Sequence, residues 1–150
     1  QCACGRNGCL ERLGSRERMS RMAQEKGLGE KLRGEDGAFS FRKLFALAEE
    51  GDPAALALTD HLARCYGDAL HNVAVVYNPD QVIFQGSIGH AGPSFDQQLR
   101  RHMQGFCYYP EDGAFRIGYE AADLLTLNAD GGWYMLNEHY FQDEHLYQDE

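Results

Sequence analysis

Three cysteines lie close together near the start of the sequence, at a spacing that suits a metal ion. Cys2, Cys4 and Cys9 are separated by one residue and then by four. Thiolates at this spacing can turn inward on one soft cation, and Zn²⁺ takes four tetrahedral ligands from Cys and His. Gly5 and Gly8 permit the backbone angles of a tight turn. The spacing predicts a zinc site whose fourth ligand lies elsewhere. The alternative is buried free cysteines or a disulfide.

The same stretch resembles the zinc signature of the ROK family, a name that covers repressors, open reading frames and kinases. Residues 2–11 match every fixed position of the signature C-x-C-G-x-x-G-C-L-E. In that family the fourth ligand is a His upstream of the cysteines. No His of this sequence matches it, so we expect an upstream His, a water or a neighbouring chain to complete a structural zinc site. The resemblance also implies that Glu11 hydrogen-bonds a sugar hydroxyl. The alternative is that Glu11 only complements the positive end of the first helix.

A second stretch of interest joins an apolar segment to a glycine-containing turn. Residues 81–85 have the composition of a strand, and Gly86 and Ser87 follow them. A strand that runs into such a turn and then a helix favours a ligand at the carboxyl end of the strand. In ROK sugar kinases the matching turn lines the adenine nucleotide and carries Gly-Gly, where this chain has Gln85-Gly86-Ser87. We interpret Gly86 and Ser87 as the remnant of a nucleotide loop or as a simple sheet-to-helix turn.

The caps and the apolar spacing predict the elements that must position these residues. Asn7 caps a helix over 8–26, which Gly14 interrupts and Ser15 can restart. Ser40 opens the next helix, and Asp52-Pro53 opens a long helix that ends at Asn78. The predicted helices are 8–26, 40–51, 52–77, 92–105 and 122–141, and the predicted strands are 81–85 and 115–119. His61 and Cys65 lie one turn apart on the long helix and could share a metal. No third ligand is in view, so packing is the preferred interpretation.

Composition limits the possible functions. The chain has 150 residues, 43% of them apolar, and a formal net charge of -9. No apolar run approaches the ~20 residues of a bilayer span. The negative charge argues against this segment holding DNA phosphates, which need a basic face. Five cysteines, three of them in the predicted metal site, indicate a reducing compartment, so we expect a cytoplasmic protein.

Alternating helices and short strands predict an α/β architecture. The resemblance implies one domain over 1–150, namely the C-terminal lobe of the ribonuclease H-like (actin-like ATPase) fold. The N-terminal lobe, its phosphate loop and catalytic Asp, and any DNA-binding domain are expected upstream. Without a phosphate cradle, Mg²⁺ ligands and a base, we expect no sugar phosphorylation by this chain alone.

Two functions remain open. The resemblance implies either the sugar-sensing and dimerising part of a zinc-stabilised repressor, or the C-terminal half of an ATP-dependent hexose or N-acylhexosamine kinase. ATP and Mg²⁺ would be needed only if the parent protein is a kinase. The missing glycines favour the repressor, which would reach DNA through an upstream domain. We also expect a homodimer, with Tyr108, Tyr109, Trp133 and Tyr134 as contact candidates. The alternative is that these aromatic residues fill the core.

Overall fold

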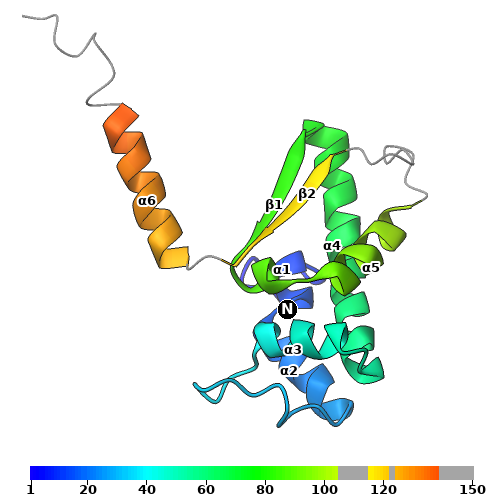
Figure 1. Cartoon of the computed structure of the whole chain (residues 1–150). Coiled ribbons are helices and arrows are strands. Elements are labelled where there is room, and N and C mark those ends of the chain that lie inside the picture. Colours follow the sequence, from blue (N-terminus) through cyan, green and yellow to red (C-terminus); the bar gives the residue numbers. More distant parts are fainter. Residues whose placement is uncertain (105–114, 122–123, 139–150) are drawn as a thin grey trace, which may run out of the picture.

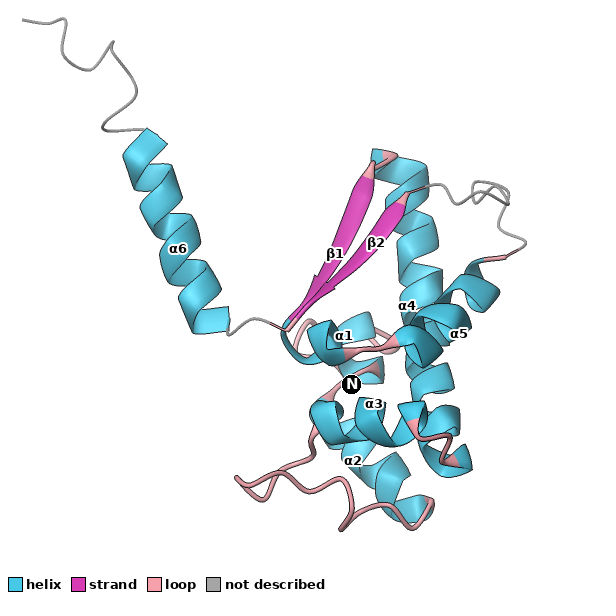
Figure 2. Ribbon diagram, in the orientation of Figure 1, coloured by secondary structure: helices cyan, strands magenta, loops and turns pink. Residues whose placement is uncertain are grey.

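The structure is a computed structural model that describes residues 1–104, 115–121 and 124–138. Helices dominate it, with one small sheet at one end (Figures 1 and 2). In chain order the elements are α1 (Leu10–Leu13), α2 (Arg16–Glu25), α3 (Phe41–Glu49), α4 (Pro53–Tyr77), β1 (Gln81–Gln85), the 3₁₀ helix η1 (Gly86–His90), α5 (Pro93–Met103), β2 (Arg116–Glu120) and α6 (Leu124–Asn137).

The long helix α4 begins and ends where the sequence predicts. The Asp52 carboxylate accepts hydrogen bonds from the backbone N–H groups of Ala54 and Ala55, at 2.9 and 3.0 Å, and Pro53 occupies the first turn. These are the features of a strong helix start. Asn78 ends the helix in the left-handed conformation, at φ 44°. The prediction of a helix over 52–77 is therefore confirmed.

Helix α5 packs along α4, and their contact forms much of the core. Phe95, Leu99 and Met103 of α5 are almost completely buried. The helices approach closely because α4 carries Gly67, where a Cβ atom would lie 3.3 Å from the Cβ of His102. On α4 the buried apolar side chains follow one stripe, which includes Ala55, Leu58, Leu62, Ala63 and Leu70.

The sheet has two parallel strands, β1 and β2, with Val82 opposite Ile117 and Phe84 opposite Tyr119. These four side chains are half-buried and pack against the core. The Phe84 ring lies 5.3 Å from the ring of Tyr66 on α4. Parallel strands need a crossover connection, and α5 lies on that connection. The α/β prediction is confirmed, although the described sheet is small.

The first helical region differs from the prediction of one helix capped by Asn7. Cys9 is the N-cap of α1, which ends at Gly14 after four residues. Ser15 then caps α2, because its hydroxyl oxygen accepts from the backbone N–H of Arg18 at 3.2 Å. Asn7 as the cap is therefore wrong, and the restart at Ser15 is confirmed.

The last third of the chain agrees with the predictions in outline. β2 is shifted by one residue, and α6, at Leu124–Asn137, lies within the predicted range 122–141, whose residues 122–123 and 139–141 are outside the described part of the chain. Figure 1 shows α6 apart from the other elements, and Trp133 and Tyr134 are 61% and 70% exposed. They do not fill the described core. Tyr108 and Tyr109 lie outside the described residues. Within the described part of the chain, no helix combines the length and apolar character that a bilayer span requires.

Truncating Phe95 tests the core. Its fully buried ring makes edge contacts with Phe45 and Tyr119, with centroids 5.3 and 6.2 Å apart. We expect Phe95→Ala to lower the free energy of unfolding by ~3–5 kcal/mol, because it leaves a cavity. Val76→Ala, at an exposed position of α4, should change it by less than ~0.5 kcal/mol. Urea titration followed by circular dichroism measures both, and equal effects would contradict this account of the core.

Candidate functional site

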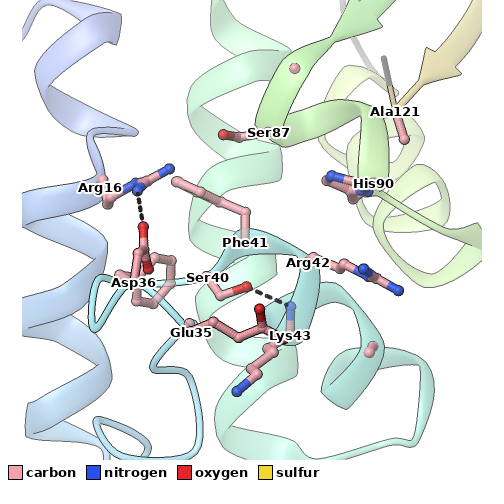
Figure 3. A pocket seen from close by; sticks show the side chains of 14 residues that line it. Arg16, Glu35, Asp36, Ser40, Phe41, Arg42, Lys43, Ser87, His90 and Ala121 are labelled. Atoms are coloured by element: carbon pink, nitrogen blue, oxygen red, sulfur yellow. Dashed lines mark hydrogen bonds and ion pairs between the residues drawn. The ribbon is translucent and has the colours of Figure 1, made fainter. Parts of the chain in front are cut away.

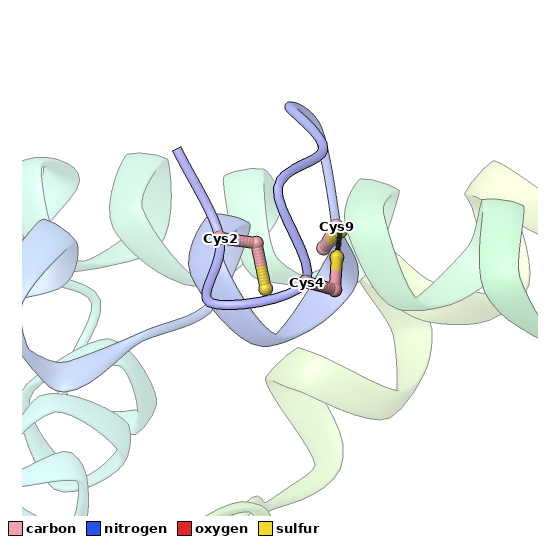
Figure 4. A group of neighbouring side chains, drawn as sticks. All are labelled: Cys2, Cys4 and Cys9. Atoms are coloured by element: carbon pink, nitrogen blue, oxygen red, sulfur yellow. Dashed lines mark hydrogen bonds between the residues drawn. The ribbon is translucent and has the colours of Figure 1, made fainter.

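The N-terminal loop brings the three predicted metal ligands together (Figure 4). The sulfur atoms of Cys2, Cys4 and Cys9 all lie within 4.8 Å of one another. The loop is closed by the backbone hydrogen bond from Cys2 N–H to the Arg6 carbonyl, at 2.8 Å. Gly5 takes φ +82°, a left-handed conformation that favours glycine. Three convergent soft ligands fit a metal ion, so this cluster could hold one.

Without a metal, the cysteines of this cluster differ in acidity. The backbone N–H of Arg6 donates toward the Cys4 sulfur and lowers the pKa of Cys4 below its usual value. The Cys9 sulfur lies 3.5 Å from that of Cys4. Hydrogen bonding to Cys4 raises the pKa of Cys9 to about 11. Cys4 is therefore the first of these two thiols to become a thiolate.

Glu11 lies in the first turn of α1, beside the cysteine cluster. The Cys2 thiol donates to its carboxylate oxygen Oε2 across 3.7 Å. Cys2 is buried whereas Glu11 is exposed, so the carboxylate remains accessible to a ligand from solvent. The structure thus brings the predicted sugar-binding residue next to the predicted metal ligands.

A cavity of about 1010 Å³ lies between the start of α2, the segment 34–46 and the turn after β1 (Figure 3). Gly86 and Ser87 line it, so both predicted loop residues border a pocket. Gly86 takes φ +65°, which lets the chain leave β1 and enter η1. The volume is that of a small-molecule site.

Sequence reasoning missed most of the cavity wall. Arg16, Arg42, Lys43 and His90 place basic groups around it. Arg16 forms an ion pair with Asp36 at 3.6 Å. The Lys43 ammonium donates to the Arg33 carbonyl at 2.5 Å. These residues come from separate segments with no common spacing, so no sequence motif could have grouped them.

The turn that borders the cavity is packed tightly against the end of β2. A Cβ atom at Gly89 would overlap the carbonyl oxygen of Glu120. On the neighbouring side, the Gln85 amide donates to the Glu120 carboxylate at 3.1 Å. The turn that borders the cavity is therefore held directly against the end of the sheet.

His61 and Cys65 do face each other on α4, with His61 Nε2 3.9 Å from the Cys65 sulfur. Burial raises the pKa of Cys65 and lowers that of His61, so both favour their neutral forms. Among the residues that the structure describes, no third metal-binding side chain joins this pair. Its contacts are those of a packed helix face.

The acidity of the cysteines can be tested by alkylation. In reduced, metal-free protein near neutral pH, we expect iodoacetamide to modify Cys4 before Cys9, because the thiolate is the nucleophile. The Cys9 rate should approach that of Cys4 only as the pH nears about 11. Peptide mass spectrometry measures each rate, and the buried Cys65 provides a slow internal control. Equal rates for Cys4 and Cys9 near pH 7 would contradict the assigned order.

Comparison with known proteins identifies two kinds of similar protein, namely glucokinases and a transcriptional regulator. The model of the ROK family matches residues 1–121. The glucokinase of Halalkalibacterium halodurans is 30% identical over 141 residues, which are 88% of this chain and 42% of that protein. The glucokinase of Thermotoga maritima is 32% identical, over 77% of this chain and 38% of that protein. The chain thus spans about two fifths of the length of these relatives.

Solved structures of both kinds of protein have a similar fold. A ROK family glucokinase from Streptomyces griseus, in complex with glucose and AMPPNP, superposes with a TM-score of 0.58 at 25% identity, covering 77% of this chain and 40% of that one. A ROK family transcriptional regulator, a homologue of the E. coli MLC protein, superposes with a TM-score of 0.60 at 24% identity, covering 84% and 33%. The cysteine signature, the α/β fold and the match over residues 1–121 agree, and the chain belongs to the ROK family.

Proposed function

We propose that this chain is the sugar-sensing and dimerising part of a ROK-type transcriptional regulator, stabilised by a zinc ion at Cys2, Cys4 and Cys9. The observation that carries the proposal is the turn after β1. There the Gln85 side chain is tied to Glu120, and the Ser87 side chain borders the cavity. By resemblance, ROK kinases have glycines in this turn, where the backbone must approach a nucleotide.

Glu11 is the proposed sugar-binding residue. Its carboxylate is exposed and can accept hydrogen bonds from two neighbouring hydroxyl groups of a sugar. The loop of residues 2–9 and the first turn of α1 position it, so a metal ion at the cysteines would hold the carboxylate in place. In this proposal zinc is structural, and it supplies no reactive water.

The rest of the regulator would lie upstream of this domain. A DNA-binding domain there would contact the operator, since the present chain has a net charge of -9. A two-fold dimer would cover the exposed aromatic residues Trp133 and Tyr134. Both features are proposals drawn from the resemblance and from the exposed surface of α6.

A sugar kinase is the second candidate, and the cavity favours it. Arg42, Lys43 and His90 could neutralise phosphate groups in a space of about 1010 Å³. The Streptomyces griseus relative was solved with glucose and AMPPNP, and two relatives are glucokinases. In a kinase, Gly86 and Ser87 would line the nucleotide, and the phosphate loop and catalytic base would be supplied by the remaining part of the protein.

Calorimetric titration separates the two candidates, using the longest natural protein that contains this sequence. We expect a hexose or an N-acylhexosamine to bind, and Glu11→Gln to weaken binding about tenfold to a hundredfold, since a hydrogen bond to a charged group contributes ~1.5–3 kcal/mol. Glu25→Gln, an exposed position on α2, is the matched control. AMPPNP binding that depends on Lys43, with phosphorylation of the sugar, would establish the kinase instead.

Light scattering tests the proposed dimer. We expect this chain to have about twice the 16.9 kDa monomer mass at micromolar concentration. Replacing the exposed Trp133 and Tyr134 by Glu should shift it to the monomer, because charges would be buried in the contact. A wild-type mass that stays at the monomer value on concentration would exclude pairing through this surface.

A further inference from the structure

Helix α1 is too short to hold its own position. It has four residues, Leu10–Leu13, and none of them is buried. A single helical turn is unstable by itself, because ordering its backbone costs entropy that few hydrogen bonds offset. The helix must therefore be held by contacts with α4, on which it packs. Glu11, the proposed sugar-binding residue, stands in this short helix.

His61 of α4 makes one of these contacts. Its imidazole N–H group donates a hydrogen bond to the carbonyl of Leu13, the last residue of α1. Carbonyl groups in the last turn of a helix have no partner within the helix, so a donor from outside stabilises the helix end. Beside this bond, Gly14 packs on α4, where a Cβ atom would lie 3.5 Å from Cδ2 of Leu62. His61 and Leu62 thus hold the same end of α1.

The surroundings of His61 keep its ring neutral. Burial lowers the pKa of His61, and the positive charges of Arg18 on α2 and Arg64 on α4 add to this effect. A neutral imidazole has one N–H donor and one acceptor nitrogen. The donor is used for the Leu13 carbonyl, and the Nε2 atom lies 3.9 Å from the Cys65 sulfur. Contacts with α4 and α1 together therefore fix the orientation of the ring.

We propose that His61 is a positioning residue for Glu11. It fixes the Leu13 carbonyl, and Glu11 lies two residues before Leu13 in the same helical turn. The inference rests on the proposed function, in which the Glu11 carboxylate binds a sugar. A carboxylate on a fixed turn loses less conformational entropy on binding a ligand than one on a mobile turn. His61 therefore raises the sugar affinity through α1 and not through a contact with the sugar.

Amide hydrogen exchange, followed by NMR, tests the contact without any sugar. The Gly14 N–H donates to the Leu10 carbonyl at 3.0 Å, so we expect it to exchange more slowly than a free amide. His61→Leu should speed this exchange about threefold to tenfold, because a hydrogen bond between α1 and α4 is lost. Asn72→Leu, the same kind of replacement at an exposed position of α4, is the matched control and should leave the rate unchanged. An unprotected Gly14 amide in the wild type, or an unchanged rate in His61→Leu, would overturn the proposal.

Calorimetric titration of the longest natural protein that contains this sequence tests the positioning role, with glucose and N-acetylmannosamine as probes. We expect His61→Leu to weaken sugar binding about threefold to tenfold. His61→Asn and His61→Gln place an amide N–H donor near one or the other ring nitrogen, so at least one of them should keep most of the affinity. In Glu11→Ala no carboxylate remains to be positioned, and adding His61→Leu should have no further effect. Circular dichroism checks that each variant folds.

The outcomes separate this inference from the proposed function. If His61→Leu weakens sugar binding equally with and without the Glu11 carboxylate, His61 acts elsewhere and the proposal is overturned. Full loss of the effect's rescue in both donor-bearing variants overturns it as well. If Glu11→Ala leaves the sugar affinity unchanged, the proposed function of Glu11 is wrong and the positioning role falls with it. The exchange rate of Gly14 still decides in that case whether His61 holds α1.

Discussion

The packing of other helices on α4 is the constraint on which the described structure depends. α1, α2, α3 and α5 all contact this helix, and the half-buried face of the sheet reaches it through Tyr66 and Phe84. Burial of apolar surface is the dominant favourable term in folding. The carboxylate of Asp52 and the left-handed Asn78 fix where α4 begins and ends. The cysteine loop is tied to this scaffold because α1, which follows it directly, packs on α4.

Most of this scaffold could be predicted from the sequence because its signals are local. Asp52-Pro53 and Ser40 cap helices by hydrogen bonds to residues two or three positions away, and the apolar stripe of α4 repeats within one turn. The predicted cap at Asn7 was wrong, because the local preference of Asn for a cap does not show where the preceding loop ends. The tight turn that closes the cysteine loop continues to Cys9, which then takes the extended backbone of an N-cap.

The candidate site also has a part that could be predicted from local sequence and a part that depends on helix packing. The cysteine cluster lies within a few residues, so spacing alone predicts that the sulfurs can meet. The basic wall of the cavity joins residues from α2, α3 and η1, whose meeting depends on how these helices pack. The contact between Cys2 and Glu11 lies between these cases. Both residues stand in the signature, but only the fold of the loop shows that they touch.

The close approach of Gly89 to Glu120 has a consequence for the shape of the cavity. Because η1 and the end of β2 leave no room for a Cβ atom between them, any larger residue at position 89 would have to push the two elements apart. Ala121, the residue after β2, itself borders the cavity. A side chain at position 89 would therefore reshape the cavity wall, although Gly89 is not itself one of the residues that line the cavity.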